Sequence, residues 1–347
     1  MAFSSGERFR SASNSARRVI ICDNILTCVS LFGVSMRVLS KYQVPSNFSE
    51  KQIEADLATF FGLCSLGEEE PPFRLLDVDE QIFGADKKFD GVIPIFMQFK
   101  KSTGLLSPLE YPVSQKKGRS RLEDIREWRH AQGFDECRSL YFKLHEKAKT
   151  ATEYQHNVLL SYERPPKTRA IYVAPLSLDS DTYFTQLTES ARGMMWPYYH
   201  RFAYEVRQGK ELVYFFEVPF LRAHISIPPH ERVEDANHFY SFSETATNVS
   251  WHSPLLISDG PSRLSDYLGR MIREILLGPE NDTSLESAAK HVADVAESYG
   301  FGESSGRFES PLEMLKQHGR WINKTFGIKQ FLFCYKKDHR HLQGRIN

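Results

Sequence analysis

The sequence predicts an α/β protein in which a mixed β-sheet is flanked by helices. Three observations carry this prediction: an amphipathic helix pattern that starts at Ser49, short runs of strand-forming residues after it, and a strand–helix–strand order over residues 138–174. A strand, a helix and a second strand in succession favour a parallel pair. Helices and strands both recur towards the C-terminus, so the sheet is expected to carry an α+β extension.

The first predicted element is a helix that begins at Ser49. Ser49 is a good N-cap residue, and Gln52 stands three positions later as its capping-box partner. The spacing of the apolar residues that follow predicts one buried stripe, made of Ile53, Leu57, Phe60 and Phe61. Glu50 and Glu54 lie one turn apart beside that stripe, so the helix is expected to present two carboxylates near the core.

Three strands are predicted after this helix, over residues 73–83, 86–93 and 95–100. Asp90-Gly91 is typical of a hairpin turn, and Pro94 indicates either a bend or a strand edge. A polar segment follows, with a helix over 120–131. The pattern then predicts a strand over 138–145, a helix over 148–162 and a strand over 169–174.

The region after Pro175 predicts further elements of both kinds. Helices are expected over 182–192, 264–277, 284–298 and 311–325, and strands over 211–218, 223–228 and 238–243. We therefore divide the chain into a peripheral N-terminal extension (1–40), a core (41–175) and an α+β C-terminal region of unknown role (176–347). For the N-terminal extension, translation from Met36 and a secretory signal around Arg17 and Arg18 are the alternatives.

Composition excludes several classes of protein. The chain has 44 Lys and Arg residues and 44 Asp and Glu residues, so it is not a polycation that coats nucleic acid, although a local basic face is possible. Its five cysteines are scattered without a C-x-x-C spacing, which predicts neither a disulfide framework nor a zinc site and favours a cytoplasmic location. The longest early charge-free apolar stretch, 24–36, is too short to cross a bilayer, so no membrane partner is expected.

The chemistry is expected around Gln98 and Lys100. Alternate residues of a strand share a face, so an amide and an ammonium emerge together while Met97 and Phe99 point into the core. A hairpin would bring Asp86 or Asp90 opposite that pair, and the preceding helix would add Glu50 or Glu54.

With these residues, the segment 49–175 resembles the PD-(D/E)xK, or restriction-endonuclease-like, nuclease superfamily. The triplet Gln98-Phe99-Lys100 stands where that superfamily has an acidic-x-lysine triplet, and glutamine at the first position is also met in its Mrr-like branch. The resemblance implies a restriction-endonuclease-like core and a metal-dependent endonuclease that hydrolyses phosphodiesters, with DNA as the expected substrate and bacterial defence as the setting. It implies Mg²⁺ or Mn²⁺ held by Asp86 or Asp90, Glu54 or Glu50, and the Gln98 oxygen, with Lys100 stabilising the transition state.

A basic segment beside this triplet is expected to grip phosphates. It contains Lys100, Lys101, Lys116, Lys117, Arg119 and Arg121 against the single acid Glu110. Gln155 and His156, on the helix after it, are further candidates for nucleic-acid contact. Because glutamine replaces the usual acid, the alternative is a catalytically silent nuclease fold that serves as a nucleic-acid-binding or assembly module. A homodimer or a larger defence complex is the assembly considered for either function.

Overall fold

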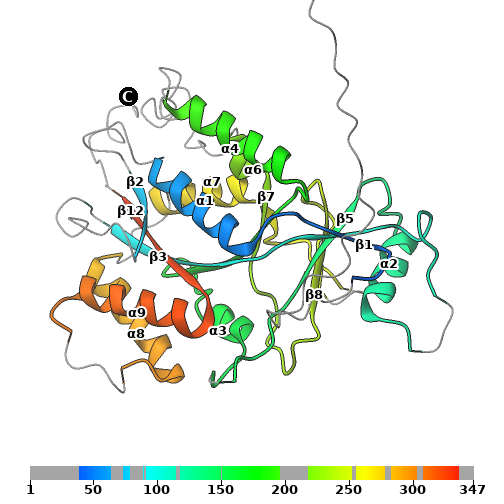
Figure 1. Cartoon of the computed structure of the whole chain (residues 1–347). Helices are drawn as coiled ribbons and strands as arrows, with labels where there is room; N and C mark the ends of the chain where they lie inside the picture. The colour runs from blue at the N-terminus through cyan, green and yellow to red at the C-terminus, as the bar shows by residue number, and fades with distance from the viewer. Residues whose placement is uncertain are drawn as a thin grey trace, which may run out of the picture. The chain divides into compact units, whose positions relative to one another are not determined.

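The computed structural model describes residues 39–63, 73–78, 89, 91–114, 118–149, 151–195, 218–251, 255–277, 283–302 and 308–335. Residues 40–347 form one compact unit. Its described strands form two six-stranded sheets, and helices cover them (Figure 1). The chain is therefore mixed α/β. None of the described helices is long and apolar enough to span a membrane.

The larger sheet holds the central strands of the fold. Its order is β11 (Ser262–Arg263), β7 (His224–Ile227), β6 (Arg169–Pro175), β3 (Gly91–Phe99), β12 (Lys329–Tyr335) and β2 (Phe73–Asp77). β3 and β6 are parallel, and every other neighbouring pair in this sheet is antiparallel. The sheet is thus mixed, as expected.

The second sheet is wholly antiparallel. It runs β1 (Gln43–Pro45), β4 (Thr103–Leu105), β5 (Ser139–Lys143), β8 (Phe239–Ser243), β9 (Ser250–Trp251) and β10 (Leu255–Leu256). Helix α2 (Arg121–Ala131) packs on it through Ile125, which joins Leu105, Tyr141 and Phe239 in a small apolar cluster.

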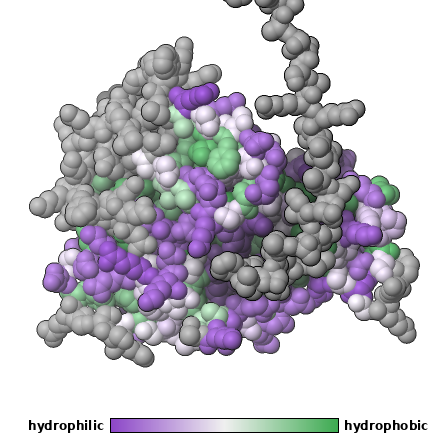
Figure 2. Space-filling model, viewed as in Figure 1, coloured by the Kyte–Doolittle hydropathy of each residue, from purple (hydrophilic) through white to green (hydrophobic). Residues whose placement is uncertain are grey.

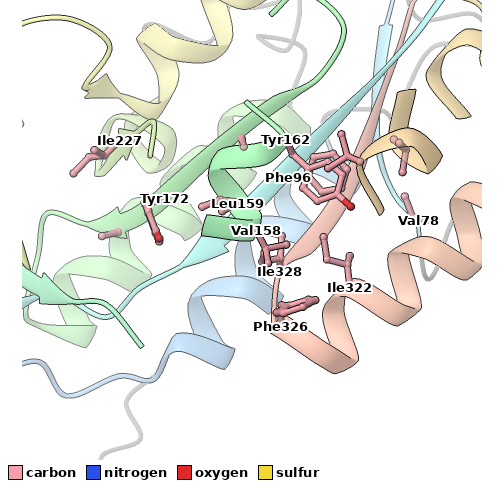
Figure 3. Packing of buried hydrophobic residues seen from close by; sticks show 14 of the residues in the cluster. Val78, Phe96, Val158, Leu159, Tyr162, Tyr172, Ile227, Ile322, Phe326 and Ile328 are labelled. Carbon is pink, nitrogen blue, oxygen red and sulfur yellow. The ribbon is translucent and has the colours of Figure 1, made fainter. Parts of the chain in front are cut away.

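Helices cover both faces of the larger sheet. One face carries α1 (Glu50–Leu63), α4 (Ser180–Met195), α6 (Pro219–Arg222) and α7 (Leu264–Leu277), and the other carries α3 (Gln155–Ser161), α8 (Leu285–Ala296), the 3₁₀ turn η3 (Glu297–Tyr299) and α9 (Pro311–Phe326). The side chains of β3 divide accordingly: Met97 and Phe99 join the cluster under α1, and Phe96 joins the opposite one. In that second cluster Phe96 packs against Tyr162 with ring centroids 4.1 Å apart (Figure 3).

Several predicted elements are confirmed. Helix α1 begins after Ser49, whose Oγ accepts the Gln52 N–H at 3.2 Å, and its apolar stripe is buried. The Gln52 side chain, however, donates to Asp56. Helices α2, α4, α7, α8 and α9 and strands β5, β6, β7 and β8 lie where the sequence predicts them, apart from differences at their ends.

The prediction of two strands at 86–93 and 95–100 is wrong, because β3 is one nine-residue strand that contains Pro94. The Val92 N–H donates to the Thr283 carbonyl on the side away from β12. Two residues later the Pro94 nitrogen faces the same side, and β6 starts to pair only at Ile95. Proline is tolerated there because no strand needs its missing N–H.

Other predictions differ in extent or partner. The helix predicted over 148–162 covers only Gln155–Ser161. The parallel partner of β6 is β3, not the strand before α3, since β5 belongs to the other sheet. The described strands after Pro175 enter both sheets, and residues 40–347 form one compact unit. Of the strand predicted over 211–218, only Val218 is described, and it is the N-cap of α6. The rest of that segment lies outside the described residues, as does the chain before Leu39.

Candidate functional site

A pocket of about 420 Å³ lies where β3 ends and β12 begins. Its walls come from the first turns of α1, the residues His145, Glu146, Ala148, Ala151 and Glu153, the start of α3 and the end of α9. Glu50, Glu54, Gln98 and Gln155, four of the predicted site residues, line it together with His145. The open end of a sheet at its parallel strands is a common place for a binding site.

Gln98 brings an amide into this pocket. Its side chain is only 4% exposed, and its Nε2 donates to the Phe99 carbonyl oxygen at 3.1 Å. That bond fixes which end of the amide is the oxygen, because a flipped amide would set two oxygens against each other. The Gln98 Oε1 is buried and has no hydrogen-bond partner. A buried acceptor without a partner is costly, so this atom is suited to a cation or a donor supplied from outside the chain.

Lys100 stands two residues further on the same face, but it does not itself line the pocket and lies behind Gln155, which does. It is 1% exposed, and its Nζ donates to the Gln155 Oε1 at 3.3 Å. Gln155 in turn donates to the Phe326 carbonyl at the end of α9, so it ties the lysine to the wall of the pocket. Burial lowers the pKa of Lys100 to about 8, although the negative charge of Glu50 opposes that shift.

Glu50 contacts both Lys101, just after β3, and His145. Its Oε1 accepts the Lys101 backbone N–H at 3.2 Å, and its Oε2 lies 3.5 Å from the His145 Nε2. Burial raises the pKa of Glu50, but the hydrogen bond with His145 and the charge of Lys100 outweigh it and leave the pKa below its ordinary value. Glu50 is therefore an ionised carboxylate at neutral pH.

The glutamates reach the pocket around the end of the sheet. Gln98 and Lys100 point to the face covered by α3 and α9, whereas α1 packs on the opposite face. Helix α1 begins beside the last residues of β3, so Glu50 and Glu54, in its first two turns, still border the same pocket. The pocket therefore receives side chains from one face of β3 and from the start of α1, which packs on the opposite face of the sheet.

Two charged residues that the sequence analysis did not select lie next to Glu54. Lys329, the first residue of β12, places its Nζ 3.0 Å from the Asp77 Oδ2 and 3.6 Å from the Glu54 Oε1. Asp77 is 4% exposed, so this is a largely buried ion-pair network. Its sequence signal is the run of strand-forming residues after Lys329.

The remaining predicted residues are placed elsewhere. Asp86, Asp90, Lys116 and Lys117 lie outside the described residues. Arg119 forms ion pairs with Asp124 and Glu127, Arg121 is the first residue of α2, and neither lines the pocket. The side chain of Lys101 does not line it either, although its backbone binds Glu50.

His156 differs from the expectation that it contacts a phosphate. It is buried, its Nδ1 bonds with the Tyr172 hydroxyl at 2.8 Å, and its Nε2 bonds with the Glu231 carbonyl at 2.6 Å. The ring stacks on Trp251, and burial lowers the pKa of His156 to about 4. His156 is therefore a neutral core residue whose two nitrogens are already occupied.

The donor set of the pocket fits a hard divalent cation. In the part of the chain that the structure describes, no three His, Cys, Asp or Glu side chains cluster as a metal site. The pocket does offer four carboxylates, those of Glu50, Glu54, Glu146 and Glu153, and the free amide oxygen of Gln98. Mg²⁺ takes oxygen ligands and is commonly held by one or two carboxylates, with waters and substrate phosphates completing its shell.

Comparisons of the chain with protein-family models, with curated proteins and with solved structures find no match.

Proposed function

We propose that the chain is a divalent-metal-dependent nuclease that hydrolyses phosphodiester bonds, with DNA as its substrate. The observation that carries the proposal is the Gln98 Oε1, a buried acceptor without a partner in a pocket that also holds Glu50 and Glu54. The resemblance of Gln98-Phe99-Lys100 to the PD-(D/E)xK pattern supports the same chemistry.

The residues that line the pocket, together with Lys100 behind Gln155, would have the following roles. Glu54 and the Gln98 Oε1 would hold the ion, with Asp86 or Asp90 as further candidates for ligands. A bound Mg²⁺ or Mn²⁺ supplies charge neutralisation at the phosphate. Lys100, fixed by Gln155, stabilises negative charge that develops in the pocket, where a preorganised cation is worth more than in water. Glu50 keeps the Lys101 backbone and His145 in place.

A catalytically silent, nucleic-acid-binding module is the second candidate. Gln98 itself favours it, because a neutral amide attracts a cation less strongly than the carboxylate that the PD-(D/E)xK pattern has there. The two candidates differ in whether they cleave DNA. Metal binding tests the ligands of the pocket for both of them, independently of cleavage.

The test is a plasmid-nicking assay of the full chain with Mg²⁺ or Mn²⁺, alongside calorimetric titration of each metal. We expect metal-dependent nicking by the wild type and a loss of about a hundredfold or more in Lys100→Met, the size typical of removing a transition-state contact. Gln98→Leu should lose metal binding, whereas Gln98→Glu should retain or strengthen it.

Circular dichroism of each variant controls for folding. Salt-sensitive DNA binding without nicking would favour the silent module. Nicking that is unchanged in both Lys100→Met and Gln98→Leu would refute the assignment of the site.

A further inference from the structure

The described segment from Lys143 to Lys149 is basic and borders the pocket. His145, Glu146 and Ala148 of this segment line the pocket, as does Lys51 from the first turn of α1 on its other side. Lys51, Lys147 and Lys149 are exposed. We call Lys51, His145, Lys147 and Lys149 the pocket rim. The space-filling view shows a band of hydrophilic residues across this face, between α1 and α9 (Figure 2).

The cations of the rim are largely available for a ligand. Lys143, just before the rim, is paired with Glu146, and His145 is engaged by Glu50. The Lys147 Nζ lies 5.7 Å from the centre of the Tyr154 ring, and its charge helps to lower the pKa of Glu153. Lys51 and Lys149 form no ion pair with any residue in the described part of the chain.

The interior of the pocket is lined by carboxylates. Glu50, Glu54, Glu146 and Glu153 each lie within ion-pair distance of a basic side chain, so the interior has no excess positive charge to attract a phosphate unless a cation is bound. A polyanionic backbone that approaches the pocket therefore gains most by resting on the rim, with a single phosphate reaching inwards.

We propose that the pocket rim is the surface that holds the nucleic-acid backbone on either side of the phosphate to be cleaved. This inference rests on the proposed nuclease function. It assigns the phosphate contacts to Lys51, Lys147 and Lys149. Arg119 and Arg121 are not assigned to them, because Arg119 is already paired with two carboxylates.

The test is the salt dependence of binding to a fluorescent DNA duplex, measured with the full chain in the absence of divalent metal. The rim variant is Lys147→Gln/Lys149→Gln. Each lost phosphate contact reduces the slope of log K against log salt by about 0.9, so the slope should fall by about 1.8. The loss of affinity between 50 and 200 mM salt should then be about 12-fold smaller than in the wild type.

Two further variants remove the same number of charges elsewhere. Arg119→Gln/Arg121→Gln tests the site that the sequence predicts, and Arg164→Gln/Lys167→Gln lies beyond the other end of α3. Both should keep the wild-type slope. An unchanged slope in the rim variant, or a reduced one in Arg119→Gln/Arg121→Gln alone, would overturn the inference while wild-type nicking leaves the nuclease proposal intact. A wild type that neither binds nor nicks DNA would remove both.

Discussion

Lys100 is the residue whose charge the pocket controls most strongly. Its ammonium is almost wholly removed from water, and it has one hydrogen bond to a neutral amide and the field of Glu50 to compensate. Desolvation disfavours the charged form of a lysine. The proposed chemistry needs this positive charge, and Lys100 loses it only slightly above neutral pH because its pKa is about 8.

The lowered pKa of Lys100 predicts how the nicking activity depends on pH. Because burial lowers the pKa of Lys100 to about 8, the ammonium is present below that pH and is lost above it. Metal-dependent nicking by the wild type should fall about tenfold for each pH unit well above 8, measured as initial rates with circular dichroism to check folding. A rate that stays level up to pH 10 would show that the protonated lysine is not required.

At this scale the sequence predicts some positions and misses others for identifiable reasons. The two-residue period of a strand placed Gln98 and Lys100 on one face, and α1 places both glutamates at the pocket. Gln155 and His156 are adjacent in sequence, yet only Gln155 reaches the pocket, because His156 points into the core against Trp251. A helix rotates by about 100° per residue, so the choice between neighbours depends on packing that composition does not reveal.

β12 is the longest of the described elements that the sequence does not predict. It separates β3 from β2, and it pairs with β3 over its whole length and with β2 from Phe331 to Tyr335. Its sequence, Lys329–Tyr335, is a continuous run of strand-forming residues buried on both faces, which periodicity cannot distinguish from other apolar segments. The helices α1, α7 and α9 were predictable because their apolar stripes have the helical period. The partner of a strand is set by long-range packing instead.

β12 also anchors the helix that carries both glutamates. Phe331 is fully buried and packs edge-on against Phe61 of α1 and Phe99 of β3. We expect Phe331→Ala to lower the free energy of unfolding by about 3–5 kcal/mol, as for other buried phenylalanines, measured by urea denaturation. The control Phe184→Ala removes a ring that is 40% exposed and should cost less than about 1 kcal/mol. Equal losses would mean that β12 does not support α1 in this way.

At the scale of the whole molecule, three histidines are buried as neutral groups where helices pack on the sheets. Only the packed structure reveals this feature. His156, His224 and His318 are all buried, and each accepts or donates hydrogen bonds to neutral partners. The sequence predicts the α/β class because class depends on element types and order. It does not reveal that residues after Pro175 supply strands to both sheets, because that arrangement depends on contacts between distant segments.

These histidines predict that the fold is lost in acid. Burial lowers the pKa of each of the three to about 4, whereas an unfolded histidine titrates near 6.5. Protons therefore bind the unfolded chain more tightly, so stability is complete above about pH 6.5 and falls as the pH drops towards 4, by about 1.4 kcal/mol per pH unit for each histidine.

Urea denaturation of the wild type at pH 7, 6 and 5 measures this slope. His318→Gln should reduce this slope by about 1.4 kcal/mol per pH unit. Stability that is constant from pH 7 to 5 would mean that the three rings are not held neutral by burial.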